Sequence, residues 1–119
     1  MTNPAVLVDR YIAAWNETDA TRREALVAEA FAPGARYVDP VMSGDGQAAI
    51  AAMIGAAQTQ FPGFRFRLTS PVDAYADKVR FSWGAGPAGA DTIVEGTDFA
   101  VIAGERLSVV TGFLDKVPG

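Results

Sequence analysis

Asp98 is the residue whose position along the chain points most clearly to chemistry. The residues that share its face of an alternating segment are apolar or lack a side chain, and they are Val94, Gly96, Ala100 and Ile102. If this face is interior, burial disfavours the charged form, raises the pKa of Asp98 and keeps it as a protonated hydrogen-bond donor. Apolar residues occur on the other face too, so the alternation leaves open which face is interior. The structural alternative is an Asp98 that pairs with an arginine or a backbone amide.

Asp39 is the second candidate for proton transfer. It follows Tyr37 and Val38 and precedes Pro40, and because proline disfavours helix in the residue before it, Asp39 is expected at a strand end. A purely structural role stays open, since Asp before Pro is also common in turns. Tyr11 is on the apolar stripe of the first expected helix, where a tyrosine usually belongs to the core and its hydroxyl reaches a partner at the edge.

The composition restricts the chemistry to a few groups. The sequence contains neither cysteine nor histidine, which removes thiolate nucleophiles, imidazole bases, disulfides and the usual zinc ligands. Carboxylates, hydroxyls, lysine and arginine remain. We therefore expect a site that uses neither a metal nor a cofactor.

The charge balance argues against two classes of partner. A formal net charge of -4 and a sequence pI of about 4.6 provide no basic field to attract a phosphate backbone or an anionic lipid. The first residues show no basic region followed by an apolar run, and no long uncharged apolar segment occurs later. We expect a cytoplasmic protein that binds neither nucleic acid nor membranes.

Three helices are expected in the first half of the chain. Asn3 is a suitable cap for a helix over 4–16 that has proline in its first turn. Thr21 and Glu24 match the capping-box pattern and predict the start of a second, short helix. An alanine-rich segment with apolar residues on one face predicts the third helix over 47–60.

The second half of the chain alternates with the period of a β-strand. Phe66 and Phe81 are central to two such segments, and the glycine-rich stretch 84–91 predicts a long connection between strands. Pro71 interrupts the first of these strands and predicts a bulge or bend that curves the sheet. We expect one α+β domain over 1–119, with three N-terminal helices packed on a strongly curved, mostly antiparallel sheet.

Other prominent side chains are assigned to structure. Trp15 and Trp83 are expected to pack in the core without a chemical role, because aromatic residues on a core stripe usually do so, and lining a pocket is the alternative. Arg65, Arg67 and Arg80 share the polar faces of neighbouring strands. Solvated or interfacial ion pairs are expected there in preference to an anion site.

Four short segments, each weakly specific by itself, occur together along the chain: Arg10–Asn16, Tyr37–Pro40, Gly44 ahead of the third helix, and Gly96–Phe99. As a set they resemble the SnoaL-like branch of the nuclear-transport-factor-2-like superfamily, over nearly the whole chain. The resemblance implies a cone-like fold with an internal apolar pocket for a small molecule, and a homodimer formed through the outer face of the sheet. Functions in this branch extend from polyketide cyclases to proteins with no known reaction.

Within that superfamily, Tyr11, Asp39 and Asp98 match positions that the bacterial ketosteroid isomerases share. That resemblance implies that Asp39 is the general base that moves a proton alpha to a carbonyl. Tyr11 and a protonated Asp98 would donate hydrogen bonds to the enolate oxygen, which is coherent chemistry for a stabilised carbanion. The residue-level analysis agrees independently only on Asp98.

Other enzymatic branches resemble this chain less. A limonene-epoxide-hydrolase-like site has an arginine two residues before the late-strand acid, where this sequence has Gly96. The absence of histidine excludes a scytalone-dehydratase-like site, and it also excludes the acid and histidine pair of polyketide cyclases. Asp115, near the end of the last expected strand, is expected to be exposed to solvent.

The sequence therefore predicts a small-molecule-binding protein that acts as a cofactor-independent isomerase on an apolar, steroid-like or polyketide-like carbonyl compound. The alternative is a non-catalytic ligand-binding or dimerisation module of the same fold. Geometry separates the two, because an enzyme needs Tyr11, Asp39 and Asp98 to converge on one cavity, whereas a binding module needs only a pocket.

Overall fold

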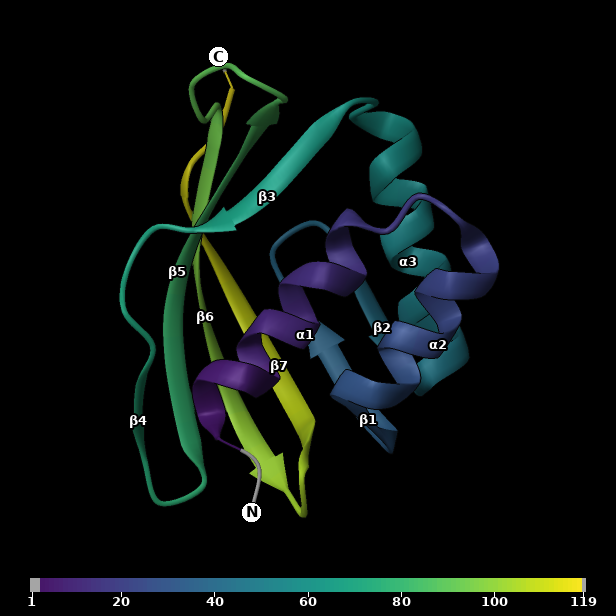
Figure 1. The fold of residues 1–119 in the computed structure, drawn as a ribbon, viewed down its shortest axis with the longest axis vertical. Helices are drawn as coiled ribbons and strands as arrows, with labels where there is room; N and C mark the ends of the chain where they lie inside the picture. The colour runs from purple at the N-terminus through teal and green to yellow at the C-terminus, as the bar shows by residue number, and fades with distance from the viewer. Residues whose placement is uncertain (1–2, 119) are drawn as a thin grey trace.

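A computed structural model describes residues 3–118. Three helices cover one face of a seven-stranded sheet (Figure 1). The helices are α1 (Pro4–Asn16), α2 (Ala20–Ala30) and α3 (Gln47–Gln60). This arrangement confirms the predicted α+β architecture of N-terminal helices on a mostly antiparallel sheet.

The sheet has the strand order β2-β1-β7-β6-β5-β3, and β4 pairs with β5 outside this path. All neighbouring pairs are antiparallel except β1 with β7, which run parallel. The strands are β1 (Phe31–Val38), β2 (Ser43–Asp45), β3 (Phe64–Leu68), β4 (Asp73–Tyr75), β5 (Lys78–Pro87), β6 (Val94–Ala103) and β7 (Arg106–Lys116).

Local sequence signals explain where the helices begin. The side chain of Asn3 accepts a hydrogen bond from the backbone N–H of Ala5, as expected for the cap of α1. The predicted capping box at Thr21 is wrong, because α2 begins at Ala20 and its cap is Asp19. Asp19 has extended backbone geometry and accepts from the N–H of Arg22, which leaves Thr21 inside the first turn. The bounds of α1 and α3 are as predicted.

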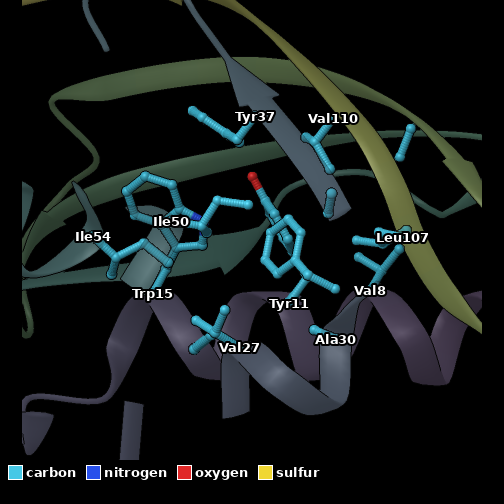
Figure 2. Close-up of a cluster of buried hydrophobic side chains, with 14 of the residues drawn as sticks. Val8, Tyr11, Trp15, Val27, Ala30, Tyr37, Ile50, Ile54, Leu107 and Val110 are labelled. Carbon is cyan, nitrogen blue, oxygen red and sulfur yellow. The ribbon is translucent and has the colours of Figure 1, made fainter. Parts of the chain in front are cut away.

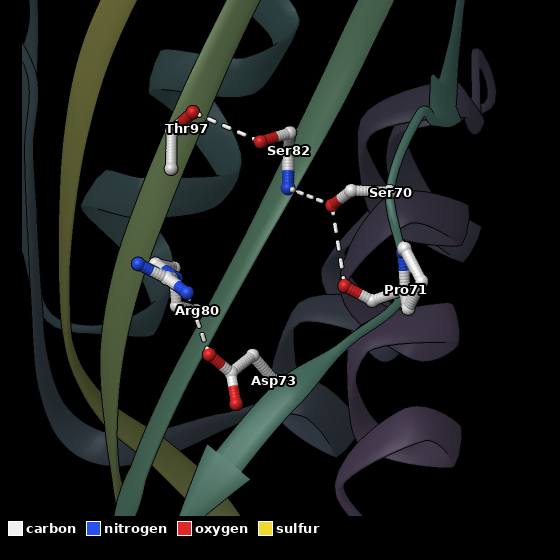
Figure 3. Close-up of polar contacts among 6 residues, drawn as sticks. All are labelled: Ser70, Pro71, Asp73, Arg80, Ser82 and Thr97. Atoms are coloured by element: carbon white, nitrogen blue, oxygen red, sulfur yellow. Dashed lines mark hydrogen bonds and ion pairs between the residues drawn. The ribbon is translucent and has the colours of Figure 1, made fainter.

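Pro71 lies in the break between β3 and β4, both of which pair with β5. Figure 3 shows this break, where Ser70 accepts a hydrogen bond from the backbone N–H of Ser82. The predicted interruption of the strand is therefore confirmed. The break at Pro71 divides the chain that pairs with β5 into the two short strands β3 and β4.

The predicted connection over 84–91 is wrong in its first half, because β5 continues to Pro87. Two glycines permit this continuation of β5. A side chain at Gly84 would collide with Thr92, and one at Gly86 would collide with Asp91, both in the segment that leads into β6. The strand thus approaches the returning chain closely, and the turn that joins them is shorter than expected.

The main core lies between the helices and the covered face of the sheet. In Figure 2, Tyr11 and Trp15 from α1 and Val27 from α2 meet Tyr37 from β1 and Val110 from β7. All five side chains are buried. Helix α1 is thereby fixed over the centre of the sheet.

The other face of the sheet carries polar contacts on β4, β5 and β6. Ser82 and Thr97 are hydrogen-bonded through their hydroxyls, and Arg80 forms an ion pair with Asp73 (Figure 3). None of the described helices combines the length and apolar character needed to cross a bilayer.

Candidate functional site

The side chain of Asp98 points to the covered face of the sheet, in the middle of β6. It is only 1% exposed, and its alternating neighbours Gly96 and Ala100 are also buried, whereas Phe99 is exposed. The face of β6 that carries Asp98 is therefore interior. This answers the question that the alternation of the sequence left open.

Both carboxyl oxygens of Asp98 accept hydrogen bonds from side chains. The Tyr11 hydroxyl donates to Oδ2 at 2.7 Å, and the Trp83 indole N–H donates to Oδ1 at 3.0 Å. Tyr11 comes from α1 and Trp83 from the neighbouring strand β5, so two separate elements fix the carboxyl group. The sequence pattern assigns no chemical role to Trp83, and the signal that could have identified this hydrogen bond is its place on the strand expected to pair beside the acid.

Burial raises the pKa of Asp98 to about 6, although the hydrogen bonds from Tyr11 and Trp83 act in the opposite direction. The nearby charges of Asp39 and Asp115 also favour the protonated form. The pKa of this carboxyl group is therefore closer to neutral pH than that of an ordinary aspartate. Burial and the adjacent Asp98 raise the pKa of Tyr11 well above its usual range, so its hydroxyl stays a donor.

Asp39 follows the last residue of β1 and organises the turn to β2. Its Oδ1 accepts from the backbone N–H groups of Val41 and Met42 at 2.8 and 2.9 Å, and its Oδ2 accepts from the Tyr37 hydroxyl at 2.6 Å. The structural interpretation of Asp39 as a turn residue is therefore correct. Asp39 also lines a cavity with Tyr11 and Asp98.

The cavity has a volume of about 240 Å³ and lies between α1, α3 and the covered face of the sheet. Its walls are mainly apolar, and none of the described residues that form them is a lysine or an arginine. Val41 and Val117 lie at its exposed mouth, where they are 72% and 57% exposed. The aromatic residues of the wall are Tyr11, Trp15, Tyr37, Phe61, Phe64, Phe66 and Trp83.

Gly112 on β7 explains how two acids reach the same region. A side chain at this position would have its first carbon 2.9 Å from Oδ1 of Asp98 and 3.1 Å from Cβ of Asp39. The same point is 3.4 Å from the hydroxyl oxygen of Tyr37. The missing side chain therefore leaves the space that these three groups share.

Four rings form a continuous series along the cavity wall, which we call the aromatic belt: Tyr37, Trp15, Phe66 and Trp83. Neighbouring rings in this order have centroids 5.7, 5.2 and 5.6 Å apart. Each end of the belt is hydrogen-bonded to a carboxyl group, Tyr37 to Asp39 and Trp83 to Asp98. The indole N–H of Trp15 is buried and has no hydrogen-bond partner within residues 3–118.

The other polar residues singled out in the sequence lie away from this cavity. Arg65, Arg67 and Arg80 are exposed and do not line it. Asp115 is exposed and accepts a hydrogen bond from the Thr97 hydroxyl at 2.7 Å. Within residues 3–118, no group of three or more acidic side chains is placed to hold a metal ion.

The sequence profile of the SnoaL-like domain matches residues 8–110. The chain belongs to the SnoaL-like family. A solved structure described as a "putative isomerase of the SnoaL-like family" from Agrobacterium tumefaciens is 45% identical to this SnoaL-like protein. The match covers 97% of this chain and 99% of that one, with a TM-score of 0.91.

Two more distant structures share the fold. A hypothetical protein with a ketosteroid isomerase-like fold from Catenulispora acidiphila, solved in complex with trimethylamine, is 22% identical with a TM-score of 0.74, over 93% of this chain and 85% of its own. A "putative polyketide cyclase" from Sinorhizobium meliloti is 19% identical with a TM-score of 0.71, over 89% and 92%. No curated protein matches the sequence. The fold assignment from sequence is confirmed by these matches.

Proposed function

We propose that this SnoaL-like protein catalyses a cofactor-independent proton transfer at a carbon next to the carbonyl of an apolar small molecule. The observation that carries this proposal is that Tyr11, Asp39 and Asp98 line one apolar cavity. A general base and two hydrogen-bond donors are the groups that such a reaction needs, provided that they face one bound substrate.

In this proposal Asp39 is the base. Its carboxylate is held by two backbone N–H groups and by the Tyr37 hydroxyl, so its position is fixed before a substrate arrives. An ionised carboxylate offers about four lone-pair sites, and the three hydrogen bonds to Asp39 leave capacity to accept a substrate proton. A base that is already held in place loses little further freedom when the reaction begins.

Tyr11 and Asp98 are the proposed donors to the oxygen that gains negative charge. The Tyr11 hydroxyl now donates to Asp98, and a bound carbonyl oxygen would take the place of that acceptor. Asp98 donates only when protonated, so its raised pKa favours this role at mildly acidic pH. We expect kcat/KM to rise as the pH falls toward 6, because protonation turns Asp98 into a donor.

The ligand of a relative is consistent with a small-molecule site in this fold. The Catenulispora acidiphila protein was solved with trimethylamine. A non-catalytic ligand-binding module is the alternative function, and the extensive hydrogen bonding of Asp39 within its own turn is the observation that favours it.

We also propose that the protein is a homodimer that pairs through the outer face of its sheet. Tyr75, Phe99, Val109 and Phe113 are exposed there on β4, β6 and β7. Phe99 and Phe113 contact each other edge to face, with centroids 5.7 Å apart. Exposed apolar side chains that gather on one face are typical of a protein interface.

The test is the isomerisation of small β,γ-unsaturated ketones to their conjugated isomers, followed by ultraviolet absorbance. Asp39→Asn retains an oxygen for the two backbone N–H groups but removes the base, and we expect kcat/KM to fall by about 10³-fold. Asp73→Asn is the matched control, because it removes one charge from the outer face of the sheet and should leave the rate unchanged.

Absence of turnover by the wild-type protein, together with measurable binding of a phenol that mimics the enolate, would favour the non-catalytic module. Turnover that Asp39→Asn leaves intact would contradict the assignment of the base. Circular dichroism of each variant separates these outcomes from loss of the fold.

A further inference from the structure

Asp98 is a buried acid without a counter-ion. None of the ion pairs found within residues 3–118 includes it, and those pairs all join exposed side chains. The bonds that it accepts come from the neutral Tyr11 hydroxyl and Trp83 indole. When Asp98 is ionised, its buried charge is costly unless it is paired, and no lysine or arginine among the described residues of the cavity wall supplies the partner.

Asp39 adds to this imbalance of charge. It lines the same cavity, and its partners are also neutral: two backbone N–H groups and the Tyr37 hydroxyl. Among the described residues of the cavity wall there is no lysine or arginine. Two carboxyl groups therefore share one pocket, and no cationic side chain of this wall offsets them.

The aromatic belt provides the second recognition element. It connects Asp39 to Asp98 through the rings of Tyr37, Trp15, Phe66 and Trp83. Aromatic rings attract cations through their negative faces, and enclosures of several rings are the usual recognition site for quaternary ammonium groups. A pocket for a purely apolar ligand would not need a carboxyl group at each end of the aromatic belt.

The size of the cavity favours a compact ligand. Sites for drug-sized molecules occupy about 300–1,000 Å³, whereas this cavity has about 240 Å³. A trimethylammonium group with a short apolar or carbonyl-bearing chain fits this space more readily than a steroid. The exposed mouth at Val41 and Val117 leaves a path for the rest of such a chain.

We propose that the cavity binds the cationic head of a small amine, a trimethylammonium-like group, on the aromatic belt between the carboxyl groups of Asp39 and Asp98. The inference names the substrate class of the site in the proposed function and rests on that site. It adds that a positive charge on the ligand compensates the two acids. In such a complex Asp98 stays ionised opposite the cation, so the positive charge and the Tyr11 hydroxyl, in place of a protonated Asp98, would stabilise an enolate.

The test compares two probes of nearly the same shape. Choline carries a quaternary nitrogen where 3,3-dimethyl-1-butanol carries a quaternary carbon, so the pair differs mainly in charge. Calorimetric titration at pH 7.5 and constant ionic strength should show choline binding at least about tenfold more tightly, as cation–aromatic and ion-pair contributions predict. Equal affinity, tighter binding of the neutral alcohol, or no binding of either probe overturns the proposal.

Two variants test whether the preference for choline comes from Asp98 and from the aromatic belt. Asp98→Asn should reduce the affinity for choline at least fivefold and leave the alcohol unaffected, and Asp73→Asn on the outer face is the control for loss of one charge. Phe66→Leu removes one ring of the belt without touching a hydrogen bond of either acid, and it should also weaken choline selectively. If both site variants fold and retain the choline preference, the proposal is wrong.

The choline-binding test and the test of ketone isomerisation can succeed or fail separately. Loss of the choline preference with intact ketone isomerisation would reject the cationic ligand and keep the proposed function. A clear choline preference without turnover of any ketone would reject the proposed reaction and keep a cation-binding site.

Discussion

At the scale of single residues, this protein depends on an acid that is buried without an opposite charge. Asp98 accepts hydrogen bonds from Tyr11 and Trp83, yet burial still raises its pKa to about 6. The raised pKa shows that desolvation, together with the nearby charges of Asp39 and Asp115, outweighs the stabilisation by two neutral donors. A residue in this condition can change its charge near physiological pH, which is useful in a site that handles protons or cations.

Asp98 should make stability depend on pH in a defined direction. Because its pKa in the folded protein is raised above the value of 3.8, it favours folding below pH 4 and loses that contribution as the pH rises through 6. A shift of this size corresponds to at most about 3 kcal/mol in the free energy of unfolding. Tyr11, Trp83, Asp39 and Asp115 surround the group and contribute to the shift.

Urea unfolding of wild type and Asp98→Asn between pH 4.5 and 7.5 measures this effect. The stability of the wild type relative to the variant should fall by about 2 kcal/mol across this range, since the other acids titrate in both proteins. A difference that does not change with pH would mean that Asp98 titrates as an ordinary exposed acid.

At the scale of secondary-structure elements, glycines on the strands position the site as much as the side chains that line it. Gly112 on β7 leaves room for Asp98 and Asp39, and Gly96 on β6 lies against the Trp83 ring and the backbone oxygen of Phe113. Close approach of strands and rings of this kind requires glycine. The same Gly96 explains why an arginine two residues before Asp98 is incompatible with this site, because its side chain would displace Trp83.

Gly96→Ala should therefore be destabilising. The added methyl group collides with the Trp83 ring and with backbone that cannot move independently, and overpacking of this type costs about 1–3 kcal/mol. It should also weaken the hydrogen bond from Trp83 to Asp98 and shift the fluorescence of Trp83. Gly34→Ala is the matched control, because a methyl group there meets nothing within 4 Å.

Thermal unfolding of the two variants checks this expectation. The melting temperature should fall clearly for Gly96→Ala and stay close to that of the wild type for Gly34→Ala. Equal melting temperatures would show that β6 and β7 can separate enough to accept the methyl group.

At the scale of the whole molecule, the two faces of the sheet differ in what covers them. The helices cover the face that carries Asp98, while the outer face exposes Tyr75, Phe99, Val109 and Phe113. On this outer face Phe113 is 52% exposed and Tyr75 is 74% exposed. This contrast is the basis for the proposed homodimer.

Phe113→Glu should convert the proposed dimer to a monomer. A carboxylate on each copy would be buried without a partner in a symmetric interface, and its desolvation opposes association. Sedimentation velocity over a range of concentrations should give a dimer for the wild type and a monomer for the variant, with unchanged circular dichroism. A wild-type protein that sediments as a monomer at every concentration would exclude the outer face as a self-association surface.

The elements of this protein and the identity of its candidate acids could be predicted from the linear pattern of residues. The bounds of α1 and α3 follow from caps and apolar spacing between near neighbours, and the prominence of Asp98 follows from alternation along one strand. These are local properties, and local interactions are what a linear pattern records. The errors at Thr21 and in the stretch 84–91 also concern local signals, which competing contacts of Asp19 and Thr92 override.

The assembly of the site, in contrast, follows from tertiary packing. Which face of β6 is interior, the bond from Trp83 to Asp98, and the space at Gly112 all depend on how helices and strands distant in sequence pack together. The cavity itself is volume that no element fills, so no segment of the sequence carries a signal for it. The lack of a positive charge among its described wall residues is likewise a property of the assembled wall, because the arginines of the neighbouring strands are exposed and lie outside it.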